Sequence, residues 1–236
     1  MPSENGKIIP IFKPRGVTSF EVVRAMRREL NVRKVGHAGT LDPLAEGLLI
    51  LLTGNKTKLM GDFLKLDKEY SATFRLGVTS KSYDLETEVV EQKSNMDFSE
   101  DQTRDILKKY TGQIEQIPPE YSAAWVDGKR AYKLARRGVK FDLKPKMVSI
   151  NELEIETFAL PILKLRIVCS SGTYIRSLAR DIGNALGCGA ILTELVRTRI
   201  GSYHADEAMK FNGLSHPKTF VPQTETTTGG QKRHAA

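Results

Sequence analysis

The chain has 236 residues, of which 40% are hydrophobic and 27% charged, and its net charge is +8. This composition is typical of a globular protein with a sizeable core and excludes a chain too polar to fold. The longest apolar run, Leu48 to Leu52, is too short to cross a bilayer, and residues 1–10 hold no stretch of signal-peptide length, so we expect a cytoplasmic protein without membrane attachment.

The N-terminal part begins with a predicted helix and a loop. Thr18 and Glu21 form a capping-box pair, and the apolar residues that follow recur at helical spacing, which predicts a helix over 19–30. Residues 35–47 are punctuated by glycines and are predicted to form a loop. The apolar run 48–52 then fits either a buried strand or the start of a helix, and periodicity does not separate the two.

The rest of the chain mixes strands and helices without regular alternation. Apolar and polar residues alternate over 70–76 and 163–169, which predicts half-buried strands. A capping box at Ser99 predicts a helix that ends at Gly112, and helical spacing predicts another over 175–186. One-sided burial of several strands favours an α+β fold on a mixed, mainly antiparallel sheet.

The positive charge is concentrated in one segment. Residues 129–146 hold eight basic residues and one acid, so they carry a net charge of +7, nearly the whole excess of the chain. Such a concentration suggests a polyanionic partner, although a solvated helix face has the same composition. The basic residues are Lys129, Arg130, Lys133, Arg136, Arg137, Lys140, Lys144 and Lys146.

Several kinds of site are not supported by residue spacing. The stretch from Gly47 to Thr57 lacks the adjacent Gly-Lys of a phosphate-binding loop. The histidines and cysteines are scattered without metal-ligand spacing, so we expect no metal and no cofactor. Cys169 and Cys188 are expected to be buried free thiols.

The loop at 36–47 is the most informative candidate site. Pro43 favours an extended backbone at Asp42, and the nearby glycines allow a ligand to approach closely. A carboxylate held there beside His37 fits a nucleophile or a base, whereas the alternative is an aspartate that only caps a turn.

Five ordered stretches within residues 8–205 carry specific motifs. They are KPRGVTS at 13–19, GHAGTLDP at 36–43, DKEY at 67–70, QIPPEYSA at 116–123, and SGTYIRSL at 171–178, which continues as GCGA at 187–190 and Leu195. Together these stretches resemble the TruB family of pseudouridine synthases. The resemblance implies the pseudouridine synthase fold and the isomerisation of uridine 55 in the T loop of tRNA, after the base is flipped out of the RNA.

The resemblance also assigns catalytic roles. It implies that Asp42 is the catalytic carboxylate and that Arg176 pairs with it, which favours its ionised form. Tyr70 would stack on the target base and is the candidate for removing the C5 proton. Which bond Asp42 makes first is left open by the sequence.

Binding roles follow from the same resemblance. His37 would sit where the flipped base leaves the stack, and Tyr174 and Leu195 would form the walls of the substrate pocket. The basic segment would lie on an RNA-gripping insertion at about 114–146. Its spacing predicts that Lys129, Lys133, Arg136 and Arg137 share one helical face. The expected RNA-binding residues are Lys129, Arg130, Lys133, Arg136 and Arg137.

The expected organisation is a catalytic domain over 1–215 followed by a disordered polar tail over 216–236. The family pattern has a glycine three residues after Asp84, where this chain has Thr87, so we expect an altered turn there. Many members carry a C-terminal RNA-binding PUA domain, and too few residues follow the matched region to form one.

The expected partner is therefore the T arm of tRNA, bound by a monomer with no obligate protein partner. Two alternatives remain: a guide-dependent ribosomal RNA pseudouridine synthase of the dyskerin type, and a non-catalytic RNA-binding or RNA-chaperone protein. An unrelated hydrolase with an aspartate nucleophile would leave the basic segment unexplained.

Overall fold

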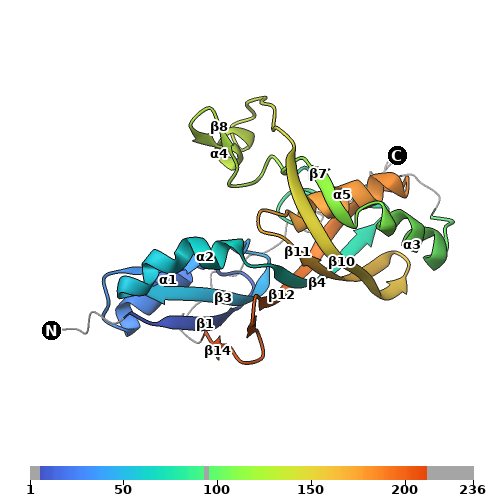
Figure 1. Cartoon of the computed structure of the whole chain (residues 1–236). Helices are drawn as coiled ribbons and strands as arrows, with labels where there is room; N and C mark the ends of the chain where they lie inside the picture. Colours follow the sequence, from blue (N-terminus) through green and yellow to red (C-terminus); the bar gives the residue numbers. More distant parts are fainter. Residues whose placement is uncertain (1–5, 93–95, 212–236) are drawn as a thin grey trace, which may run out of the picture.

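A ten-stranded, mainly antiparallel sheet runs through the computed structural model, which describes residues 6–92 and 96–211 (Figure 1). The main path of the sheet has the order β14-β1-β3-β12-β4-β11-β10-β7, with β2 pairing with β3 and β13 pairing with β12. The predicted α+β class is confirmed. The predicted tail at 216–236 lies outside the described residues.

The large sheet and two small hairpins account for the strands. The large sheet contains β1 (Ile8–Lys13), β2 (Val35–Ala38), β3 (Glu46–Thr53), β4 (Lys68–Leu76), β7 (Gly112–Gln116), β10 (Lys146–Ala159), β11 (Ile162–Cys169), β12 (Ala190–Ile200), β13 (Tyr203–His204) and β14 (Met209–Lys210). The hairpins are β5 (Val78–Thr79) with β6 (Val90–Glu91), and β8 (Trp125–Val126) with β9 (Lys129–Arg130).

Helices cover the sheet or connect its strands. They are α1 (Ser19–Glu29), a 3-10 helix (Gly54–Leu59), α2 (Met60–Lys65), α3 (Glu100–Lys108), α4 (Ala131–Ala135) and α5 (Ile175–Ala185). The helix predicted from Thr18 and Glu21 is confirmed as α1, because both hydrogen bonds of the capping box form. The capping box at Ser99 likewise opens α3.

Two of the predicted boundaries are wrong. The segment 35–47 is not one loop, because Val35–Ala38 pairs with β3 and only the residues between the two strands remain irregular. The helix α3 ends at Lys108, and Gly112 instead begins β7 with a positive φ of 91°. Both differences arise from strand pairing over a long sequence separation, which local propensity does not report.

Two halves of the large sheet meet where β3 lies parallel to β12. At this junction Gly47 is the partner of Arg197, and its φ is +105°. A Cβ atom on Gly47 would lie 2.3 Å from the carbonyl oxygen of Arg197, so a larger residue would push the strands apart. This close approach brings the loop that precedes β3 against β12.

The main core lies between α5 and the adjoining strands. Leu178, Ala179 and Ile182 of α5 are fully buried against the apolar faces of β4 and β11. Cys169 and Cys188 are buried and free, as predicted. Among the residues described, no helix is long and apolar enough to cross a membrane.

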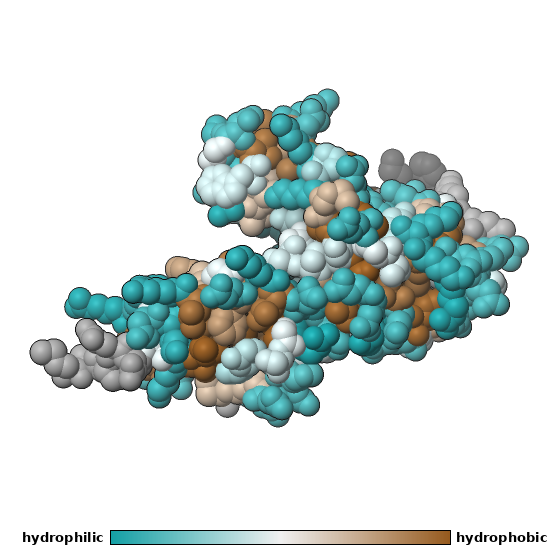
Figure 2. Space-filling model, in the orientation of Figure 1, coloured by the Kyte–Doolittle hydropathy of each residue, from teal (hydrophilic) through white to brown (hydrophobic). Residues whose placement is uncertain are grey.

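A small lobe leaves the sheet between β7 and β10, over residues 117–145. It contains β8, β9 and α4 and projects from the body of the molecule (Figure 1). Figure 2 shows a hollow between this lobe and the body beneath it. The prediction of one basic helical face is wrong, because Lys129 and Arg130 lie in the hairpin strand β9 and α4 covers only Ala131–Ala135.

Candidate active site

The loop between β2 and β3 holds Asp42 in a defined position. Ser19, the first residue of α1, accepts a hydrogen bond from the Leu41 amide at 2.9 Å and donates one to the Leu41 carbonyl at 3.1 Å. The amide of Gly16 donates to the Pro43 carbonyl at 2.7 Å. Both neighbours of Asp42 are therefore fixed, while 42% of its own side chain stays exposed.

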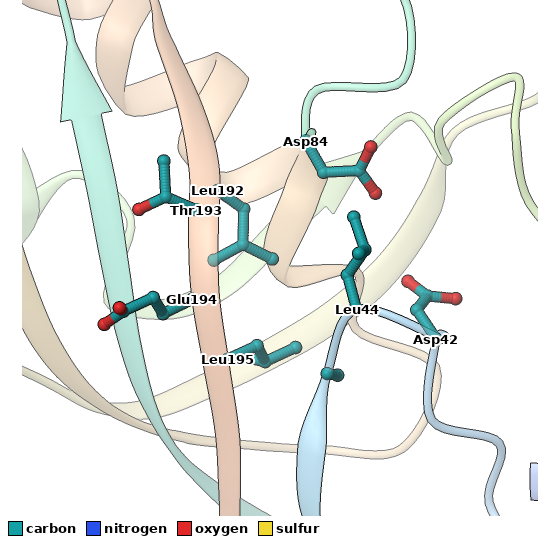
Figure 3. A pocket seen from close by; sticks show the side chains of 8 residues that line it. Asp42, Leu44, Asp84, Leu192, Thr193, Glu194 and Leu195 are labelled. Carbon is teal, nitrogen blue, oxygen red and sulfur yellow. The ribbon is translucent and has the colours of Figure 1, made fainter. Parts of the chain in front are cut away.

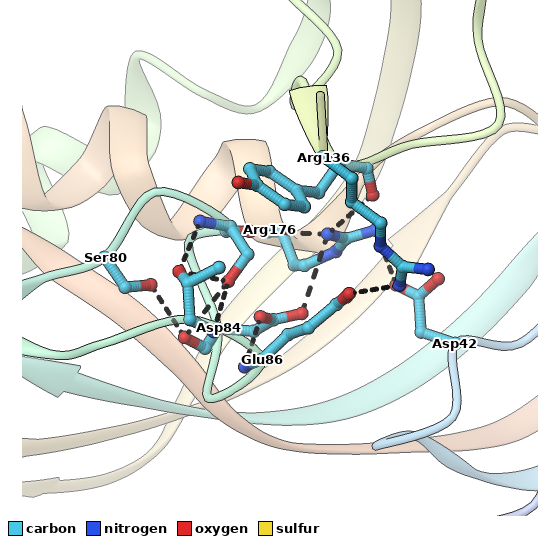
Figure 4. A network of polar contacts seen from close by, with 9 residues as sticks. Asp42, Ser80, Asp84, Glu86, Arg136 and Arg176 are labelled. Atoms are coloured by element: carbon cyan, nitrogen blue, oxygen red, sulfur yellow. Dashed lines mark hydrogen bonds and ion pairs between the residues drawn. The ribbon is translucent and has the colours of Figure 1, made fainter. Parts of the chain in front are cut away.

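Arg176, near the start of α5, joins two carboxylates (Figure 4). Its Nη2 lies 2.9 Å from Oδ2 of Asp42, and its Nη1 lies 3.5 Å from Oδ2 of Asp84. Nη1 also donates to the carbonyls of Ser82 at 3.3 Å and Tyr121 at 3.1 Å. The guanidinium is only 5% exposed, so its direction is set by buried partners, and it points one of its nitrogens at the exposed carboxylate.

The turn at 80–87 holds Asp84 against the site. Thr87 Oγ1 accepts from the Ser82 amide at 3.0 Å, so the side chain of Thr87 closes this turn. The amide of Glu86 donates to Asp84 Oδ1 at 2.9 Å, and the carbonyl of Tyr83 accepts from the Leu192 amide at 2.9 Å. These bonds tie the turn to β12.

Arg176 favours the ionised form of the buried Asp84. Burial raises the pKa of Asp84 above its ordinary value, and the charge of Arg176 is the largest influence that lowers it. A buried carboxylate without such a partner would take up a proton. Arg176 therefore supports two acids at once, one buried and one open to solvent.

A β-bulge in β12 places Leu192 and Leu195 on the same face of the sheet. The register shifts between Leu192 and Glu194, so Thr193 is an extra residue, and the usual alternation is reset. Figure 3 shows Leu192 and Leu195 pointing towards Asp42 and Asp84, whereas Thr193 and Glu194 point away. The result is a narrow pocket with apolar walls and two carboxylates at its rim.

Tyr70 lies on the same face, directly opposite Arg197 of β12. Tyr70 is almost fully buried, and this burial raises the pKa of its phenol, while the nearby Arg197 lowers it to a smaller extent. The hydroxyl is therefore neutral at neutral pH.

Two buried cations near Asp42, Arg197 and Lys13, are not among the site residues predicted from the sequence. Arg197 is 1% exposed, and it donates from Nε to the Leu48 carbonyl at 2.7 Å and from Nη2 to the Gly39 carbonyl at 3.0 Å. Lys13, at the end of β1, is fully buried and donates to the carbonyls of Pro14 and Val17. Burial lowers the pKa of Lys13 to about 8, and the charge of Asp42 opposes this shift.

A signal for Arg197 exists in the sequence, since it stands two residues after Leu195 in a strand, and such residues share a face. Lys13 stands in the first of the five family stretches. Neither signal indicates burial, because a lone basic residue in a strand is ordinarily at the surface.

The remaining predicted residues lie at the periphery. His37 is half-buried in β2, and burial followed by the charge of Arg197 lowers its pKa. Tyr174 precedes α5, and its amide donates to Oε1 of the buried Gln116 at 2.8 Å. Leu195 lines the pocket of Figure 3, whereas His37 and Tyr174 do not.

The basic lobe contacts the site through Arg136. Its Nη2 lies 2.6 Å from Glu86 Oε1 (Figure 4), and its guanidinium lies over the ring of Tyr132. The side chains of Lys129, Lys133 and Arg137 are exposed. Arg136 is thus structurally distinct from the other basic residues of the lobe, because it connects the lobe to the turn that carries Asp84.

The chain matches a family model described as the TruB family pseudouridylate synthase N-terminal domain over residues 27–175. A second model, the tRNA pseudouridylate synthase B C-terminal domain, matches residues 176–227. Proteins named tRNA pseudouridine synthase B are 47% identical in Bacteroides fragilis, over 89% of this chain and 92% of the relative, and 49% identical in Parabacteroides distasonis, over 86% and 89%.

Solved structures show the same fold. A crystal structure of a Cbf5-Nop10-Gar1 complex aligns with a TM-score of 0.68 and 31% identity, and an H/ACA RNP bound to a substrate RNA containing 2′-deoxyuridine aligns with 0.65 and 28%. These alignments cover 86% and 88% of this chain, and the chain spans about half the length of each aligned chain.

Proposed function

The chain belongs to the TruB family of pseudouridine synthases, and we propose that it isomerises uridine to pseudouridine in tRNA, at position 55 of the T loop. The observation that carries this proposal is the exposed carboxylate of Asp42, held by a buried Arg176 at the rim of an apolar pocket. A carboxylate that only capped a turn would not need a buried cation aimed at it.

The chemistry breaks the bond between C1′ of the ribose and N1 of uracil. The freed uracil turns, a bond forms between C1′ and C5, the C5 proton leaves, and N1 takes up a proton. Atoms and electrons balance without any oxidant or nucleotide, so we propose that no cofactor is used. Asp42 can attack the ribose, attack the base or remove a ribose proton. All three routes require an ionised carboxylate with an open approach, which the partly exposed Asp42 offers.

The other site residues have proposed roles around the flipped base. Leu195 forms one apolar wall, and its place beside Leu192 in the pocket supports this role. Tyr70 stacks on uracil and takes the C5 proton. The proposed role of Tyr174 is a further wall around the bound base, and that of His37 is a contact with the RNA where the base leaves the stack.

Recognition of tRNA falls to the lobe. Lys129, Lys133 and Arg137 offer exposed charges to phosphates, and Arg136 connects the lobe to the turn at 80–87 through Glu86. The T arm fits this arrangement, since it presents a folded loop beside a paired stem. We further propose that the enzyme acts as a cytoplasmic monomer whose catalytic domain spans 1–215.

A guide-dependent synthase is the second candidate, and the solved Cbf5 complexes favour it at the level of the fold. It is supported less, because relatives that match this chain along nearly their whole length, at 47–49% identity, bear the name tRNA pseudouridine synthase B.

The test is an assay on purified components. The protein is incubated with a tRNA transcript labelled at C5 of uridine, and label release and the position of pseudouridine are measured. We expect one modified uridine, at position 55, from wild type and from Asp105→Asn, a change of an exposed aspartate on α3. Asp42→Asn should release no label while binding tRNA within a few-fold of wild type. Failure of wild type without a guide RNA would reject the proposal, and turnover by Asp42→Asn would reject the catalytic assignment.

A further inference from the structure

Trp125, the chain's single tryptophan, is 63% exposed on the lobe. It stands in β8, which Figure 1 shows on the projecting part of the lobe. An indole is a large apolar surface, and leaving it in water forgoes the stabilisation that burial would give. An exposed indole on a projecting lobe is therefore a candidate contact for a ligand.

The hairpin holds this indole in one orientation. The guanidinium carbon of Arg130 lies 4.0 Å from the centroid of the ring, and Arg130 Nη1 donates to the carbonyl of Ala123 at 2.5 Å. Trp125 and Arg130 are direct cross-strand partners. Arg130 therefore covers one face of the indole, and the exposed area includes the opposite face.

The turn and the flanking hydrogen bonds make the hairpin rigid. Asp127 and Gly128 both have positive φ, 46° and 76°, which is the two-residue turn that matches the twist of paired strands. Beyond the hairpin, the amide of Ala131 donates to the Ala124 carbonyl at 2.8 Å. The platform is thus formed before any ligand arrives, which lowers the entropy cost of binding.

Position and charge indicate the ligand. Tyr121, whose carbonyl binds Arg176, precedes Trp125 by four residues, so the two Cα atoms lie at most about 14 Å apart. The segment 129–146 that follows carries a net charge of +7. A flat aromatic face beside excess positive charge fits a nucleobase attached to a phosphate backbone. An apolar protein segment or a membrane surface would contact the apolar surface of the indole and would not require its flat face.

We propose that Trp125, backed by Arg130, is a stacking site for one unpaired base of the substrate RNA. This inference rests on the proposed function, because it places that base within a few nucleotides of the uridine that reaches Asp42. Arg136 ties the lobe to the turn at 80–87 through Glu86, so a base held on Trp125 would help to hold the lobe over the RNA.

The single tryptophan allows a direct test by fluorescence. Emission of the full chain is followed while a T-arm stem-loop is added, and in parallel a fully paired duplex of equal length, which offers similar phosphates but no unpaired base. We expect strong quenching with the stem-loop, retained at high salt once the complex is saturated, and little with the duplex. Equal quenching by both RNAs, or none by the stem-loop, would overturn the stacking site.

Three variants separate stacking from simple apolar contact. Trp125→Phe keeps an aromatic face, Trp125→Leu keeps apolar volume, and Trp125→Ala removes both. We expect the affinity for the stem-loop to fall by roughly tenfold or more in the alanine variant, nearly as much in the leucine variant, and least in the phenylalanine variant. If Trp125→Leu keeps the wild-type affinity for the stem-loop, the contact is apolar and does not depend on stacking, and the proposal is rejected. Thermal unfolding should be unchanged, because the side chain is exposed.

Label release from C5 distinguishes this failure from that of the proposed function. If wild type modifies tRNA and Trp125→Ala matches it in affinity and kcat/KM, the stacking site alone is wrong. If wild type modifies no tRNA, the proposed function fails, and quenching by the stem-loop still reports whether Trp125 binds an unpaired base.

Discussion

The Nη2 atom of Arg176 lies 2.9 Å from Oδ2 of Asp42, and the two side chains differ sharply in exposure, 5% against 42%. The cation is therefore part of the folded core, while the carboxylate remains open to a substrate. Because the same guanidinium also supports the buried Asp84, we expect a change at Arg176 to affect both stability and activity. The part of the stability effect that comes from Asp84 should depend on pH.

Arg176→Met should destabilise the protein more at pH 8 than at pH 4. Burial already raises the pKa of Asp84, so the stability contribution of this group is present at low pH and is lost as pH rises through the folded-state pKa. In Arg176→Met, Asp84 must ionise at pH 8 without its partner. The free energy of unfolding should therefore fall by about 3–5 kcal/mol more at pH 8 than at pH 4. Urea unfolding at the two pH values measures the difference.

The matched control for this prediction is Arg166→Met, since Arg166 forms half-exposed ion pairs with Glu69, Glu152 and Glu154 and should cost no more than about 1 kcal/mol at either pH. Adding Asp84→Asn to Arg176→Met should restore part of the stability at pH 8. A loss that is independent of pH would show that Arg176 acts through packing alone.

Tyr70→Phe should bind tRNA as wild type does but stall late in the reaction. The variant keeps the ring that is proposed to stack on uracil and loses the hydroxyl that is proposed to take the C5 proton. Rapid quenching should reveal a broken N1 linkage without completed proton loss. Tyr110→Phe is the control, because it also removes a hydroxyl with a hydrogen bond, to the Asp181 carbonyl at 2.9 Å. Normal single-turnover rates in Tyr70→Phe would exclude this residue as the base.

Lys13→Met should change how stability depends on alkaline pH. The pKa of Lys13 is lowered from 10.5 to about 8 in the folded state, so between these values the unfolded chain binds more protons and wild type gains stability as pH rises. The advantage of wild type over Lys13→Met should therefore grow by roughly 3 kcal/mol across this window. Denaturant unfolding of both proteins gives this difference, and Lys7→Met, at an exposed position, should show none.

Neutralising Lys129, Lys133 and Arg137 together should weaken tRNA binding and flatten its dependence on salt. Each phosphate contact that is lost reduces the logarithmic salt slope by about 0.7–0.9. The saturated rate should change little, since Arg136 and its link to Glu86 are left intact. Binding is measured by filter retention at several salt concentrations.

The control for charge is a variant neutralised at Lys7, Lys56 and Lys109, three exposed lysines outside the lobe. It alters the net charge equally, so an equal drop in the salt slope would mean that the lobe has no special contact with the RNA.

Features that depend on local interactions can be predicted from the sequence. The capping box of Thr18 and Glu21 opens α1 because its hydrogen bonds span three residues. The alternation over 70–76 indicates a strand, as the side-chain period of a strand is two. The loop that carries Asp42 was found through its motif, and the pairing of Asp42 with Arg176, expected from the resemblance, is present.

The residues that surround Asp42 are brought together by the tertiary structure. The bulge at Thr193 resets the alternation of β12. As a result, Leu192, Leu195 and Arg197 all lie on the same face of the sheet as Tyr70 of β4. The pleat period alone would have sent Leu192 and Leu195 to opposite sides of the sheet. The burial of Lys13 likewise arises from contacts between segments that are distant in the sequence. A local pattern carries no information on those contacts, because their energy depends on what packs against each residue.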